Sequence, residues 1–122
     1  YYCACRNIPQ KGALMVDIGA ESSNLEKAKA EILRQLDEIR NGNITDEELE
    51  SALASLENAL CQIGDTPSSY SAWYFERFCD GQISTPQEQL LNYKNVTKAR
   101  IIEAANSVKL DSIYLMLAKE EA

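Results

Sequence analysis

Histidine is the most informative absence from this sequence, because none of the 122 residues is a histidine. Zinc sites in proteins usually use imidazole or several thiolates as ligands, and Ser–His and Cys–His nucleophile pairs need an imidazole base. The sequence also lacks a glycine-rich phosphate loop and a G-x-S-x-G nucleophile elbow. We therefore expect no catalytic residue, no metal ligand and no cofactor site within this chain.

Positive charge and long apolar runs are also scarce. The chain carries 12 Lys and Arg against 19 Asp and Glu, a net charge of −7. This balance argues against nucleic acid and anionic membranes as partners, because both attract clustered Lys and Arg. No apolar run approaches the roughly 20 residues that span a bilayer. The start of the chain has no signal-peptide pattern. Because the first residue is Tyr1 and not Met, we expect the chain to be a piece of a longer protein. A composition of 45% hydrophobic and 25% charged residues is typical of a globular chain, here one domain or less.

Cysteine is present four times, as Cys3, Cys5, Cys61 and Cys79. The spacing is irregular, and a chain of this size does not need disulfides to hold a core. We therefore predict four buried or half-buried thiols in a reducing compartment, which favours the cytoplasm. Cys3 and Cys5 would share one face of a strand. A redox or metal role for this pair is the alternative, although a structural zinc site usually has four ligands.

The first 20 residues predict a β-hairpin. Residues 9–12, Pro-Gln-Lys-Gly, are typical of a turn. In the segment 13–20, Leu14, Val16 and Ile18 alternate with more polar positions, which predicts a half-buried strand.

About five helices are predicted to follow. Apolar residues recur every three or four positions from Leu25 to Ile39, and Asn41-Gly42-Asn43 is expected to end this first helix. The later helices are expected to begin at capping residues Thr45, Thr66, Thr85 and Thr97, with capping-box glutamates at Glu48 and Glu88. The alternation of Ile113, Leu115 and Leu117 predicts a final strand over 110–118.

Two strands, a run of helices and one strand indicate the α+β class. We expect a small antiparallel sheet, formed by the N-terminal hairpin and the C-terminal strand, with one face covered by the helices. The cluster Glu47, Glu48 and Glu50 could form a catalytic carboxylate pair, but caps and a solvated helix end explain it. The aromatic group is either a ligand platform or a core or domain contact; it comprises Tyr70, Trp73, Tyr74, Phe75 and Phe78.

The order of motifs resembles a known family. An aromatic opening is followed by an alternating strand, a helix start, an Ile-Thr-Asp-Glu-Glu-Leu stretch and a Leu-Asp-Ser-Ile-Tyr ending. The motifs are Tyr1-Tyr2-Cys3, Asp17-Ile18-Gly19-Ala20-Glu21, Asn24-Leu25-Glu26-Lys27-Ala28, residues 42–49, Asn95-Val96-Thr97-Lys98 with Ala104-Ala105, and residues 110–114. Together they resemble the last part of the second domain of the pitrilysin, insulysin and mitochondrial processing peptidase family, in its bacterial zinc-protease branch. The resemblance covers nearly the whole chain.

The resemblance implies a metallohydrolase-like fragment, residues 1–122, that forms the C-terminal portion of a non-catalytic domain. In this family, zinc belongs to a separate catalytic domain with an inverted H-x-x-E-H motif, and the two halves close around an unfolded peptide. The non-catalytic half supplies an Arg and, seven residues later, a Tyr that contact the substrate. That Tyr would correspond to Tyr1, or to Tyr2 if the register shifts by one, and the Arg would precede the first residue. A phenol here could donate a hydrogen bond to the scissile carbonyl, although both tyrosines could equally be ordinary strand residues.

Two readings of the resemblance stay open. The chain is expected to be a substrate-chamber-forming part of a zinc metallopeptidase, or a purely structural or interaction module of a parent that has lost its zinc chemistry. The expected partners are other domains of the same parent chain and a peptide substrate. An exposed hairpin edge would also allow homo-oligomers.

Overall fold

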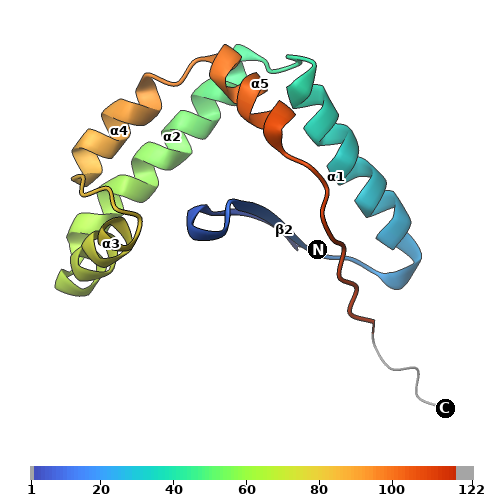
Figure 1. The fold of residues 1–122 in the computed structure, drawn as a ribbon, viewed down its shortest axis with the longest axis horizontal. Coiled ribbons are helices and arrows are strands. Elements are labelled where there is room, and N and C mark those ends of the chain that lie inside the picture. Colours follow the sequence, from blue (N-terminus) through green and yellow to red (C-terminus); the bar gives the residue numbers. More distant parts are fainter. Residues whose placement is uncertain (1, 118–122) are drawn as a thin grey trace. The chain divides into compact units, whose positions relative to one another are not determined.

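The computed structural model describes residues 2–117, which divide into two compact units. Unit 1 comprises the chain up to Asn41 together with the part from Ile102 onward, and unit 2 comprises Gly42–Ile101. Figure 1 shows the elements along the chain, and each unit is described by itself. Among the described residues, no helix combines the length and the apolar character that crossing a membrane requires.

Unit 1 begins with the predicted hairpin. β1 (Tyr2–Ile8) pairs antiparallel with β2 (Ala13–Gly19), in a register that places Tyr2 opposite Gly19 and Ile8 opposite Ala13. The connection is a 3₁₀ turn over Pro9–Lys11, closed by Gly12 at φ 57°. Glycine suits this position because a Cβ disfavours positive φ. The predicted hairpin and its turn are therefore confirmed.

The predicted helices are present as α1 (Leu25–Arg40), α2 (Asp46–Gln62), α3 (Pro67–Cys79), α4 (Pro86–Lys94) and α5 (Lys98–Ser107). Thr45 and Thr85 each form a complete capping box with the glutamate three residues later. Gly42 and Gly81 follow α1 and α3 at φ 79° and 70°, as a left-handed C-terminal glycine does. Local sequence signals therefore set most helix boundaries.

In unit 2, α4 lies beside α2 (Figure 1), and α3 contacts the 3₁₀ turn Ile63–Asp65 that ends α2. Lys94 Nζ reaches Glu57 Oε1 at 3.2 Å between α4 and α2. At the other end of α2, Lys98 Nζ donates to the Ile44 carbonyl at 2.8 Å and pairs with Asp46 at 2.7 Å. Leu60, on α2, is one of the two buried hydrophobic positions among the described residues.

In unit 1, the end of α1 is joined to the end of α5. Arg40 Nε donates to the Ala105 carbonyl at 3.1 Å, and Arg40 Nη2 donates to the Val108 carbonyl at 2.5 Å. The last carbonyls of a helix have no intrahelical partner, so a guanidinium at this point satisfies them. Ala105 is the second buried hydrophobic position among the described residues.

The α+β class is confirmed, but two details of the predicted sheet are wrong for the described residues. The sheet has two strands, and residues 110–117 run without strand pairing, so the C-terminal strand is not part of it. Leu14, Val16 and Ile18, predicted to share the buried face of a half-buried strand, are exposed. An alternating pattern predicts which side chains share one face of a strand. Which strand pairs with it, and what covers that face, depend on non-local contacts.

Candidate functional site

A depression in unit 1 brings together the start of β1, the end of β2 and the first turns of α1. Its volume is about 520 Å³, and it is open to solvent. Eight residues line it, from both strands and the helix: Tyr2, Cys3, Ile18, Gly19, Ala20, Asn24, Lys27 and Ala28. Ala20, Glu21 and the short 3₁₀ turn Ser22–Asn24 connect β2 to α1, and this short connection brings the helix start beside the strand ends.

The aromatic ring of Tyr2 forms one wall of this depression. The register pairs Tyr2 with Gly19, and a Cβ built on Gly19 would lie 3.6 Å from Tyr2 Cδ1. The ring therefore lies over the glycine, where the absence of a side chain leaves it room. Tyr2 is 55% exposed, so a ligand can reach it from solvent.

The polar groups around this wall are few. Lys27 is the cationic residue among those lining the depression, and Asn24 adds an amide. Further along the hairpin, Arg6 hydrogen-bonds Asp17, and this bond raises the pKa of the Arg6 guanidinium. Since Arg6 is paired with Asp17 and does not line the depression, Lys27 is the cation that the lining offers to an anionic group.

The two predicted substrate-contact residues have different outcomes. Tyr1 lies outside the described residues, and Tyr2 lines the depression. Sequence reasoning did not select Asn24, Lys27 or Ala28 for this site. The signal for them was present, because the connection from Gly19, the last residue of β2, to Leu25, the first residue of α1, is only five residues long and so keeps the helix start near the strand end.

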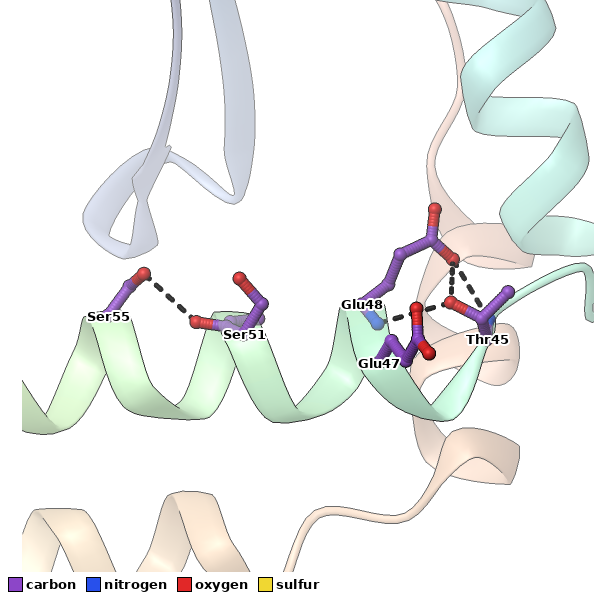
Figure 2. A pocket seen from close by; sticks show the side chains of 6 residues that line it. Thr45, Glu47, Glu48, Ser51 and Ser55 are labelled. Atoms are coloured by element: carbon purple, nitrogen blue, oxygen red, sulfur yellow. Dashed lines mark hydrogen bonds between the residues drawn. The ribbon is translucent and has the colours of Figure 1, made fainter.

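A second depression, of about 610 Å³, follows the exposed side of α2 and is lined by Thr45, Glu47, Glu48, Ser51, Ala52 and Ser55. Figure 2 shows the Glu48 carboxylate folded back onto Thr45. Glu48 Oε2 accepts hydrogen bonds from the backbone N–H and the hydroxyl of Thr45, both at 2.8 Å. The Glu48 N–H donates to Thr45 Oγ1 at 3.1 Å.

The hydrogen bond from the Thr45 backbone N–H is the main cause that lowers the pKa of Glu48. The carboxylate is therefore held ionised and engaged, which suits a cap and not a general acid. The pKa of Asp46 is lowered mainly by its hydrogen bond with Lys98. These contacts support the prediction that the acidic cluster at the start of α2 is a helix cap.

The four cysteines are free and exposed, so the prediction of buried or half-buried thiols is wrong. Cys3 and Cys5 lie on the uncovered hairpin, and Cys61 and Cys79 lie on the solvent sides of the ends of their helices. Within residues 2–117, no three His, Cys, Asp or Glu side chains come together as a metal site would require.

The aromatic group on α3 divides into two sides. Trp73 is half-buried; its Nε1 donates to the Ser84 carbonyl at 2.9 Å, and the Arg77 guanidinium lies 5.0 Å from its ring centre. Arg77 also pairs with Asp80 at 3.1 Å. The other four rings are exposed, and Tyr70 and Tyr74 stack with their centres 6.4 Å apart. Trp73 therefore holds the segment after α3, while Phe75 and Phe78 are the most exposed of the other rings.

Comparison with known proteins gives one informative relative. The chain is 32% identical, over its full length, to a protein of Bacillus subtilis (strain 168) named "Probable inactive metalloprotease YmfF". The chain spans 29% of that relative's length. No model of a known protein family matches the sequence, and no solved structure matches it. The similarity supports a relationship to metallopeptidase-like proteins.

Proposed function

We propose that this chain is a non-catalytic, substrate-chamber-forming part of a zinc-dependent metallopeptidase that acts on peptides. The observation that carries the proposal is the 32% identity across the whole chain to a protein named as an inactive metalloprotease. The matched region is 29% of the relative, so the relative is more than three times as long as that region. The proposal therefore assigns this chain a supporting role within a longer polypeptide.

The donor set of the chain does not fit a zinc centre. Zinc in peptidases is held by imidazole and carboxylate ligands, and it polarises the scissile carbonyl and activates a water molecule. The sequence has no histidine, and its cysteines lie on three separate elements. Zinc would therefore belong to a separate catalytic domain of the parent.

The Tyr2 depression offers three kinds of contact to an extended peptide. The Tyr2 phenol can donate a hydrogen bond to a backbone carbonyl, and Lys27 can pair with a carboxylate. Ile18 and Ala28 provide apolar lining. In addition, the two-stranded sheet leaves strand edges that could take up a peptide through main-chain hydrogen bonds.

A substitution at Tyr2 tests this role. Tyr2→Phe in the parent polypeptide removes the hydroxyl and keeps the ring, so binding of an unfolded peptide should weaken about 2- to 10-fold, the value of one hydrogen bond. Fluorescence anisotropy with a labelled peptide measures this change. Tyr114→Phe is the matched control, because Tyr114 is an 86% exposed phenol outside the depression. Equal affinities for all three proteins would refute the contact.

The second candidate is a structural or interaction domain of a catalytically dead parent, which the word "inactive" in the relative's name favours. The residues upstream in the parent distinguish the two. An intact H-x-x-E-H motif, bound zinc and peptide cleavage by the parent favour the first candidate. A parent without the motif favours the second. In either case, the chain alone should neither bind zinc stoichiometrically nor cleave peptides, which metal analysis and a peptide-digestion assay would check.

A further inference from the structure

An aromatic face on α3 has no function in the contacts described above. Tyr70, Tyr74 and Phe78 are spaced four residues apart, and Phe75 is three residues before Phe78, so it extends their surface around the helix. Phe75 and Phe78 are 72% and 69% exposed, and Tyr70 and Tyr74 are 40% and 38% exposed. The four residues occupy one broad side of the helix, which we name the α3 aromatic face.

This face is pre-organised by its own contacts. Tyr70 and Tyr74 stack with nearly parallel rings, 9° apart. The Tyr70 hydroxyl lies 3.4 Å from the position that a Cβ on Gly64 would take, so the stack rests against the turn Ile63–Asp65. Rings that are already ordered lose little conformational entropy when a partner covers them.

The exposed area of the α3 aromatic face can be compared with the areas that different kinds of partner bury. The four exposed fractions amount to about 2.2 complete aromatic side chains, which is roughly 440 Å² at about 200 Å² each. A stable complex between separate molecules buries about 800 Å² per partner. A contact between domains of one polypeptide buries about 600–1,500 Å² in total, or about half of that per side. The area is therefore small for a dimer and sufficient for a domain that is covalently attached.

We propose that the α3 aromatic face is the docking surface for another domain of the same polypeptide. This inference rests on the proposed function, because it needs the longer parent that the 29% coverage of the relative supports. The face carries no charge, because all four of its residues are tyrosine or phenylalanine, and Arg77 on the same helix pairs with Asp80. The surface of the partner domain must therefore be apolar, with hydrogen-bond acceptors for the hydroxyls of Tyr70 and Tyr74.

Hydroxyl-radical footprinting of the chain alone and of the parent polypeptide tests this proposal without any peptide. The oxidation rate of Phe75 and Phe78 should fall several-fold in the parent, while Trp73, on the inner side of α3, should react at a similar low rate in both. The double variant Phe75→Ser/Phe78→Ser should lower the melting temperature of the parent by several degrees and leave that of the chain alone unchanged. Glu76→Ser, on the same helix outside the face, should leave both melting temperatures unchanged.

Several results would overturn the proposal. Equal oxidation of Phe75 and Phe78 in both proteins would mean that no domain docks on the α3 aromatic face. A gene that encodes only residues 1–122 would also exclude an attached domain. Protection in the chain alone that disappears on dilution would identify a second copy as the occupant. An equal loss of melting temperature in both proteins would mean that the rings stabilise the chain's own fold. Because footprinting uses no peptide, a parent that protects Phe75 but binds no peptide would refute only the proposed function.

Discussion

Replacing Arg40 with methionine is expected to separate the end of α1 from the end of α5. Methionine keeps most of the aliphatic stem and removes the guanidinium, which donates to the carbonyls of Ala105 and Val108. These carbonyls belong to residues 65 and 68 positions away in the sequence. The substitution therefore removes a long-range contact, together with one exposed ion pair to Asp37 on the same helix, and leaves helix propensity almost unchanged.

The size of the effect follows from the charge and burial of the donor. A hydrogen bond that involves a charged group contributes about 1.5–3 kcal/mol, and a buried acceptor left without a partner adds a desolvation cost. The Arg40 side chain is 29% exposed, so solvent can replace part of these bonds. We expect the two bonds together to contribute about 2–3 kcal/mol, which is a large share of the roughly 5–15 kcal/mol that stabilises a typical domain.

Urea denaturation followed by circular dichroism measures this loss. With a slope of about 1–3 kcal/mol per molar urea, the midpoint of Arg40→Met should fall by about 0.7–3 M. Arg34→Met is the matched control, because Arg34 lies on the same helix and pairs only with exposed glutamates. Exposed ion pairs add little to stability, so its midpoint should hardly move. Equal midpoints for the two variants would refute the argument that Arg40 joins α1 to α5.

Two further predictions concern the helix caps. Thr45→Ala removes the N-cap of α2 and should lower the free energy of unfolding by about 1 kcal/mol, whereas Ser55→Ala, on the same side of α2, should change it little; thermal melts of both variants compare them. The second prediction concerns pH. Hydrogen bonds from the backbone N–H groups of Thr45 and Thr85 lower the pKa values of Glu48 and Glu88 below 4.5, so the folded state binds protons less readily than the unfolded state. Their stabilisation should be complete above about pH 5 and lost as the pH falls through the folded-state pKa values. Melting temperatures measured between neutral and acidic pH should show this fall, and Glu48→Gln should make it shallower; a melting temperature that rises on acidification would contradict the assignment.

The sequence predicted the local structure well because the interactions concerned span only a few residues. Thr45 with Glu48, and Thr85 with Glu88, are pairs three residues apart, and both capping boxes are present as predicted. Asn24 precedes α1 without a side-chain cap, because residues 22–24 form a 3₁₀ turn that leads into the helix. Gly64, predicted to end α2, lies within the 3₁₀ turn that extends it.

Predictions that depend on distant residues were less accurate. The C-terminal strand was predicted from alternation alone, yet residues 110–117 pair with no strand in the described structure. The cysteines were predicted to be at least half-buried from composition, yet all four are exposed. For the site, sequence reasoning selected Tyr2, but the position of Lys27 beside it follows from how β2 leads into α1.

By itself, the sequence determined the helices, the hairpin and their caps, and the lack of histidine determined that an imidazole-based zinc centre cannot form here. The tertiary structure decided which apolar faces stay exposed, which side of α3 packs inward around Trp73, and which carbonyls Arg40 joins. The physical reason is the range of the interactions. Caps and periodicity act within one or two helical turns, whereas burial and strand pairing depend on residues that the chain brings together only on folding.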